Sequence, residues 1–313
     1  MSNHKQNAKF TFFYLLSLVA LGFMATCTGV IVFQIINKTI LDVMEYSGFS
    51  SSALRFAISA IIISAPIYYV MMSQINKNLR TGALDKESAL RRWLTYLIIF
   101  AASGVVMGWL IATVNMFLGG ELTVKFILKA LTVLIIAGAV FSYYLYDVKR
   151  EKMGKSIITK IFFFGSIALV LASFITAFCL VDSPQVARDR KADLEVVNDF
   201  SMISESINIY YNNQKALPAD LNVLTEENGV YLTTKELGHL IDKNAEEKYE
   251  YKITGTDSFE LCATFKTSNK EAKDDLDYRY YGEYWNHDAG YQCLKKKVND
   301  YSKDGSPIPV PYQ

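Results

Sequence analysis

Histidine, cysteine and proline are scarce in this chain of 313 residues, which contains three, four and six of them. So few metal-ligating side chains leave little basis for a metal centre, and the long apolar segments contain no histidine, which excludes bis-histidine haem there. The chain also contains no P-loop, no glycine-rich dinucleotide fingerprint and no Gly-x-Ser-x-Gly elbow. We therefore expect no cofactor and no catalytic residues, and the chain is predicted not to be an enzyme.

Charge is divided unevenly along the chain. Residues 1–181 contain 16 Lys and Arg against 7 Asp and Glu, whereas residues 182–313 contain 16 against 24. The first part is therefore basic and the second acidic, a split that is rare within one soluble domain. We expect a first unit over 1–181, a second over 182–300, and a flexible, proline-rich tail over 301–313.

Five long apolar runs dominate the first unit. About 20 apolar residues in a helix cross the hydrocarbon core of a bilayer, and a helix satisfies its own backbone groups there. The runs predict five spanning helices, over about 10–36, 54–76, 93–118, 124–146 and 157–181. The first run is too long for the apolar core of a signal peptide. The fold class expected for this unit is an all-α five-helix transmembrane bundle.

The basic residues between the spans indicate an orientation. Twelve lie in the N-terminus and in the second and fourth loops, and four lie on the opposite side: Lys38, Arg55, Lys125 and Lys129. Since basic loops stay in the cytoplasm, the N-terminus is predicted to be cytoplasmic and residues 182–313 extracytoplasmic. The basic loops are interpreted as charge facing the membrane surface, and no nucleic-acid partner is expected.

The cysteines of the second unit fit an exported compartment, where disulfides persist. Cys262 and Cys293 are predicted to form a bridge, and the alternative is two free, buried thiols. Cys27 and Cys179 lie in separate apolar spans, so they are expected to be inert.

The second unit has the pattern of a small α+β domain. An apolar face repeats at spacings of three and four residues through Leu194, Val197, Phe200, Ile203, Ile207 and Tyr210, which predicts a long helix. Strand-like runs follow at Tyr249–Thr254, Phe259–Phe265 and Tyr278–Trp285. A long helix packed on an antiparallel sheet is therefore expected.

Several motifs of the first unit point to a known family. They are Arg91-Arg92-Trp93-Leu94-Thr95-Tyr96, Phe117-Leu118-Gly119-Gly120-Glu121-Leu122-Thr123, Phe126-Ile127-Leu128-Lys129, Tyr143-Tyr144-Leu145-Tyr146-Asp147, and Leu54-Arg55-Phe56-Ala57-Ile58 with the later Ala65-Pro66. Together they resemble the domain of unknown function 5671 family over about 10–150. The resemblance implies a multi-pass bacterial membrane protein without an assigned activity.

The second unit carries another resemblance. Ala187-Arg188-Asp189-Arg190-Lys191-Ala192-Asp193-Leu194, the helix end at Ile207–Tyr211, Leu217-Pro218-Ala219-Asp220-Leu221, and Phe259-Glu260-Leu261-Cys262-Ala263-Thr264-Phe265 carry it. Over about 186–293 they resemble type II secretion pseudopilins and type IV pilins. The resemblance implies a pilin-like domain with envelope or pilus-type protein partners.

Two groups of charged residues are candidate sites. Arg55, Glu121, Lys125 and Lys129 lie near the outer ends of the spans, where they form either an anion site or an internal ion pair with lysines that reach the interface. Asp274, Asp275, Asp277 and Asp288 supply oxygen ligands of the kind calcium prefers, and some pseudopilins bind calcium in this region. The alternative for these four residues is a solvated acidic loop. His239 and His287 are interpreted as surface or structural residues.

These observations favour a non-enzymatic envelope interaction or assembly protein that presents its pilin-like domain outside the cell. The lipid bilayer is its expected environment. The alternative function is a small-solute transporter or membrane sensor, with a polar site at the outer end of the bundle.

Overall fold

A computed structural model describes residues 2–40, 48–81, 89–149, 157–224, 249–270 and 285–299. The chain divides into two compact units, Met1–Val181 and Asp182–Gln313, and each is described by itself.

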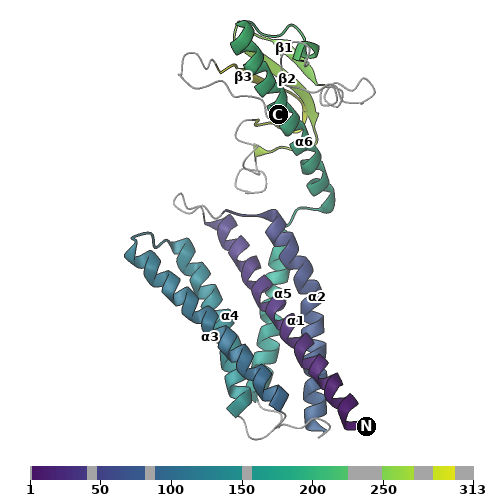
Figure 1. Ribbon diagram of the computed structural model, residues 1–313, viewed down its shortest axis with the longest axis vertical. Helices are drawn as coiled ribbons and strands as arrows, with labels where there is room; N and C mark the ends of the chain where they lie inside the picture. The colour runs from purple at the N-terminus through teal and green to yellow at the C-terminus, as the bar shows by residue number, and fades with distance from the viewer. Residues whose placement is uncertain are drawn as a thin grey trace. The chain divides into compact units, whose positions relative to one another are not determined.

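The described residues of the first unit form five long helices (Figure 1). Their bounds are Ser2–Thr39 for α1, Ser51–Arg80 for α2, Ala89–Leu118 for α3, Val124–Lys149 for α4 and Ile157–Leu180 for α5. Each contains a stretch that is long and apolar enough to cross a membrane. The prediction of five apolar helices at these places in the chain is confirmed.

Local polar contacts define several of the helix ends. Ser50 caps α2, because its hydroxyl accepts a hydrogen bond from the Ala53 backbone N–H at 3.2 Å. Thr123 acts in the same way at the start of α4, where its hydroxyl accepts from the Phe126 N–H at 3.2 Å. Between α3 and α4, Gly120 has a φ of 72°, a conformation that glycine adopts without steric penalty. A short turn therefore joins these two helices.

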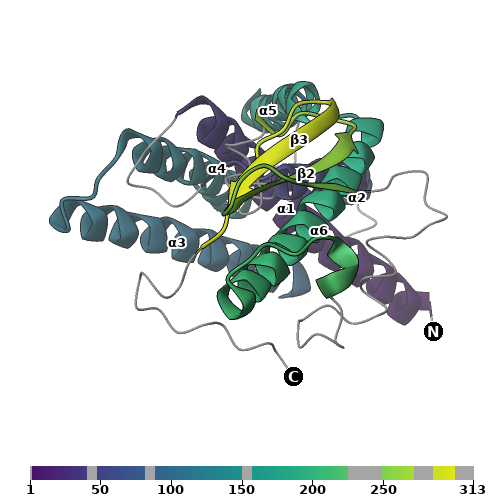
Figure 2. The ribbon, with the colours of Figure 1, turned by 90° about the horizontal axis from the view of Figure 1, so that it is seen from above.

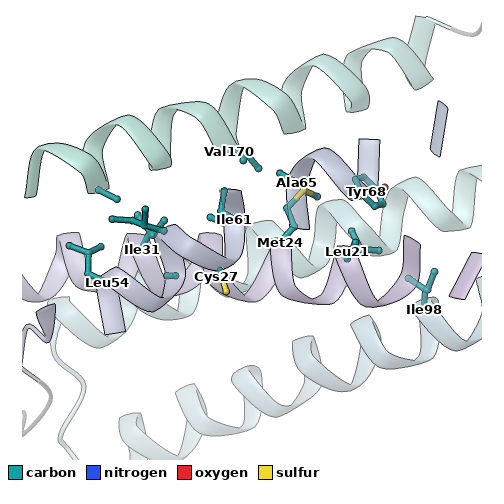
Figure 3. Packing of buried hydrophobic residues seen from close by; sticks show 14 of the residues in the cluster. Leu21, Met24, Cys27, Ile31, Leu54, Ile61, Ala65, Tyr68, Ile98 and Val170 are labelled. Carbon is teal, nitrogen blue, oxygen red and sulfur yellow. The ribbon is translucent and has the colours of Figure 1, made fainter. Parts of the chain in front are cut away.

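The core of the first unit lies mainly between α1 and α2. Figure 3 shows Leu21, Met24, Cys27 and Ile31 of α1 beside Leu54, Ile61, Ala65 and Tyr68 of α2, with Val170 contributed by α5. Helix α3 pairs with α4 and exposes most of its apolar side chains, including Phe100 and Leu118. A helix with so much exposed apolar surface suits contact with lipid chains.

In its described residues, the second unit combines a long helix with a three-stranded sheet. Helix α6 runs over Pro184–Gln214, a short 3₁₀ helix η1 covers Leu221–Leu224, and the strands are β1 (Glu250–Ile253), β2 (Ser258–Phe265) and β3 (Gly290–Lys297). The sheet is antiparallel in the order β1-β2-β3. The helix and the first two strands follow the sequence prediction. Residues 278–284 of the third expected strand lie outside the described part, and β3 lies further along the chain.

The predicted apolar face of α6 forms the core of this unit. Val197, Phe200, Ile203 and Ile207 are buried against alternate side chains of β2, namely Phe259, Leu261, Ala263 and Phe265. Figure 2 shows α6 alongside the sheet. The remaining residues of β2 point to the opposite, polar face, which also carries Glu250, Lys252, Lys295 and Lys297. The sheet therefore has one face on the helix and one polar face.

Candidate functional site

The four charged residues that were predicted to form a polar group occupy different environments. Arg55 on α2 is half-buried, and Glu121 is exposed in the turn before α4. Lys125 and Lys129 are buried on one face of α4, with exposed fractions of 3% and 6%. In the described part of the chain, neither Arg55 nor Glu121 takes part in an ion pair. The two lysines are therefore brought together, but Glu121 does not pair with them.

One of these lysines lies beside a cluster of aromatic side chains. The Nζ atom of Lys129 lies 5.9 Å from the centre of the Phe33 ring on α1. Trp109 of α3 packs edge-on against the same ring, with 5.7 Å between the ring centres, and also contacts Phe126. A cation held over an aromatic face is stabilised by the ring quadrupole. Lys129 thus lies at a junction of three helices, α1, α3 and α4.

A buried ion pair joins α3 and α4 at their other ends. The Arg91 guanidinium donates to the Asp147 carboxylate at 2.6 Å, and both side chains are largely buried. The sequence placed both residues within family motifs but did not indicate that they contact each other. Charge in an apolar helix bundle is costly unless it is paired, so this pair holds the hairpin in register.

A cavity of about 810 Å³ lies among α1, α2, α4 and α5. Six aromatic residues line it, namely Tyr68, Tyr69, Tyr143, Tyr144, Phe162 and Phe163. Lys77 and Lys160 also line it, whereas Arg55, Glu121, Lys125 and Lys129 do not. This cavity could not be predicted from the sequence, because it depends on how four separate helices pack together.

In the second unit, a disulfide joins the two strands that share the polar sheet face. Cys262 and Cys293 lie directly opposite each other in the register of β2 and β3, and their sulfur atoms are bonded. This is the bridge that the cysteine count predicted. Cys27 and Cys179 are free thiols in the first unit.

Asp193 of α6 provides a second link between helix and sheet. Its buried carboxylate accepts hydrogen bonds from the backbone N–H groups of Lys266 at 2.8 Å and Thr267 at 2.7 Å, and from the Thr267 hydroxyl at 2.6 Å. The contact fixes the end of β2 on the helix. In sequence, Asp193 resembles the other acidic residues of α6, so nothing in the pattern singled it out.

The structure describes only one of the four calcium candidates. Asp288 accepts hydrogen bonds from the Lys270 ammonium and from the Ser268 hydroxyl, and the lysine lowers the pKa of the carboxyl. Asp274, Asp275 and Asp277 lie outside the described residues, as does His239. Among the residues described, no group of His, Cys, Asp and Glu side chains is arranged to hold a metal ion. The calcium site remains a prediction.

His287 is buried beside the core of the second unit. Its ring stacks on Phe265 with 3.7 Å between the ring centres, and only 2% of the residue is exposed. Burial lowers the pKa of the imidazole, because desolvation disfavours the charged form. The structure thus places His287 as a structural residue, one of the two interpretations of the sequence.

A pH dependence of stability follows from this burial. A histidine with a lowered pKa in the folded state binds fewer protons than in the unfolded state, so stability should fall as pH drops below about 6.5, the ordinary histidine pKa. We expect the urea midpoint of the second unit to decrease between pH 7 and pH 5. Fluorescence of Trp285 in full-length W93F/W109F protein reports this transition. The His287→Gln variant should show a flatter pH profile, and an equal slope in both proteins would contradict the prediction.

The five apolar helices and the α+β unit found in the described residues define the class of this chain as a candidate multi-pass membrane protein with an appended small domain. Residues 11–144 match the model of a family described as a domain of unknown function, DUF5671. The match supports the first resemblance noted in the sequence. No curated protein and no solved structure matches the chain.

Proposed function

We propose that this chain is a non-enzymatic membrane protein that presents its second unit outside the cell, where it binds an envelope or pilus-type protein. The observation that carries the proposal is the architecture of the second unit. It follows the fifth apolar helix directly, has its own core of helix and sheet, and contains a disulfide of the kind that persists in exported compartments.

The packing of α6 decides whether this helix leaves an apolar surface for a partner. A long helix against an antiparallel sheet supports a pilin-like arrangement, but α6 covers its apolar face with its own sheet. Within the described part of the second unit, the large apolar side chains that are exposed are Met202, Ile253 and Tyr291, and of these Met202 alone lies on α6. No leftover apolar stripe is therefore found on the described helix.

The polar sheet face is the better candidate surface. Tyr291, Lys295 and Lys297 of β3 are exposed on it. The Tyr291 hydroxyl donates to Glu250 on β1, and this bond lowers the pKa of the Glu250 carboxyl. The face also carries Glu250 and Glu260, and Lys297 pairs with Asp257 at 3.0 Å. Among the described residues Lys295 takes part in no ion pair, so it is the cation that an acidic partner would meet on this disulfide-held sheet.

The sequence also favoured a transporter or sensor with a site at Arg55, Glu121, Lys125 and Lys129. In the described residues none of these four side chains lines the cavity among α1, α2, α4 and α5, and Lys129 lies over the Phe33 ring. No observation on the described residues therefore favours this second function.

The predicted orientation of the chain in the membrane can be tested with reporter fusions. A reporter that is active only outside the cytoplasm should be active when fused after Val181 or inserted at Gly120, and inactive when fused after Lys149. We expect this orientation because twelve basic residues lie on the predicted cytoplasmic side against four on the other. The disulfide of the second unit agrees with an extracytoplasmic location. Activity at Val181 from a reporter restricted to the cytoplasm would overturn the orientation and, with it, the proposed function.

Site-specific photo-crosslinking in cells tests the partner surface. A crosslinking residue at Tyr291 or Lys295 should yield a protein adduct of one defined mass, whereas the exposed control positions Gln214 and Asp220 should not. The charge-reversal variant K295E/K297E should lose the adduct made from position 291. If the four positions give the same adducts, or none gives any, the polar sheet face is not a partner surface.

A further inference from the structure

The cavity among α1, α2, α4 and α5 has an apolar interior. Met24, Ile136, Val140, Leu169 and Val170 are among the residues that line it. Its volume of about 810 Å³ lies within the range of about 300–1,000 Å³ that is usual for ligand sites. An apolar cavity in a membrane helix bundle is a place for hydrocarbon and not for a polar solute.

Several polar side chains in the cavity wall are engaged with the protein. The Tyr69 hydroxyl donates to the Ser166 hydroxyl at 3.1 Å, and Ser166 donates to the Phe163 carbonyl at 2.9 Å. Thr28 donates to the Met24 carbonyl at 2.7 Å. These bonds stabilise the wall and reduce the number of groups that remain to recognise a polar ligand inside the cavity.

Positive charge is found at one end of the cavity. Lys77 lies near the end of α2 and Lys160 near the start of α5, and both line the cavity while remaining exposed. In the described part of the chain, neither lysine has a carboxylate partner. Two such lysines, contributed by different helices at the mouth of an apolar cavity, are complementary to a molecule with an anionic head and a hydrocarbon body.

We propose that this cavity binds an anionic phospholipid. The acyl chains occupy the apolar interior between α2, α4 and α5, and the phosphate lies at Lys77 and Lys160. Basic pockets between membrane helices bind anionic headgroups in this way, and each lysine near the headgroup strengthens binding by roughly fivefold. Aromatic residues such as Tyr69 and Tyr143 line the same cavity, and amphipathic rings of this kind are enriched near lipid headgroups.

Native mass spectrometry on the full-length protein tests the proposal. The protein is reconstituted in vesicles of phosphatidylglycerol and phosphatidylcholine in equal amounts with identical acyl chains, then released with its retained lipids. We expect selective retention of phosphatidylglycerol, and a fall of roughly 30-fold in this selectivity for K77Q/K160Q. The matched control R92Q/K149Q removes two exposed basic residues that do not line the cavity, and it should retain the selectivity.

A second pair of variants tests the interior. A side chain at Gly165, which lines the cavity, has open space around its first carbon, so Gly165→Phe should fill the cavity and reduce lipid retention at least tenfold. Gly104 on α3 has the same open space but does not line the cavity, and Gly104→Phe should leave retention unchanged. Equal retention of the two lipids by the unmodified protein would overturn the proposal. Displacement of the lipid by soluble glycerol phosphate would also overturn it, because it would indicate a site for a free anion.

Discussion

Replacing Asp193 with alanine is expected to lower the free energy of unfolding of the second unit by about 3–5 kcal/mol. The carboxylate of Asp193 is 4% exposed and accepts three hydrogen bonds from Lys266 and Thr267, which follow β2. Hydrogen bonds to a charged group contribute more than neutral ones, and the alanine variant would leave two backbone N–H groups without their acceptor. The loss should detach the end of β2 from α6.

Urea unfolding of the full-length protein measures this effect. Trp285 is buried against Phe200 and donates to the Ser201 hydroxyl at 2.9 Å, so its fluorescence reports the packing of α6 on the sheet. The W93F/W109F background leaves Trp285 as the sole tryptophan. Asp193→Asn keeps one acceptor oxygen and should give an intermediate loss.

Asp189 supplies the matched control for this prediction. It lies one turn earlier on α6, and its carboxylate is 3.9 Å from the Nζ atom of the half-exposed Lys266. A solvated pair of this kind contributes about 0–1 kcal/mol, so Asp189→Ala should change stability little. Similar losses in D189A and D193A would show that negative charge on α6 matters, and not the hydrogen bonds of Asp193.

The elements that were predicted well are those whose pattern lies within one continuous stretch of the sequence. The bilayer imposes a length on each apolar helix, so the run at 54–76 predicted α2, which extends over Ser51–Arg80 because its polar ends also remain helical. The apolar face of α6 was visible for the same reason, since residues three and four apart share one side of a helix.

Strand β3 was not predicted, because its own residues do not show the pattern of a strand. It is an edge strand of the described sheet, and its end consists of Lys295, Lys296 and Lys297. Lysine is common on edge strands, but three consecutive lysines lack the alternation of apolar and polar residues from which a strand is predicted. In the structure Lys296 turns to the helix side, where its Nζ atom lies 4.6 Å from the centre of the Trp285 ring and burial lowers the pKa of the ammonium.

The candidate sites depend on contacts between distant residues, which no spacing in the sequence indicates. Asp193 and Thr267 are separated by 74 positions, and Arg91 and Asp147 by 56. The apolar cavity needs four helices to diverge by a particular amount, so it is a property of their packing. The Cys262–Cys293 bridge is a long-range contact that could be predicted from the sequence. The second unit contains two cysteines, and disulfides persist in exported compartments.

Loss of the Cys262–Cys293 bridge is expected to destabilise the second unit by about 3–4 kcal/mol. The two cysteines are 31 positions apart, and on the chain-entropy account closing a loop of this length restricts the unfolded chain by that amount. The bridge also joins β2 to the edge strand β3, so its loss should weaken β3 first. In the W93F/W109F background, C262S/C293S should show a lower urea midpoint by Trp285 fluorescence.

Reduction of the protein with intact cysteines provides an independent test of the same bridge. A reductant should lower the midpoint as much as the double serine variant does, and it should have no further effect on that variant. The control Cys179→Ser removes a free, exposed thiol of the first unit and should leave the transition unchanged. Because only a closed loop restricts the unfolded chain, labelling of both thiols after reduction must accompany the shift. Complete labelling with an unchanged midpoint would show that the helix, the Asp193 contact and the core hold the second unit together without the disulfide.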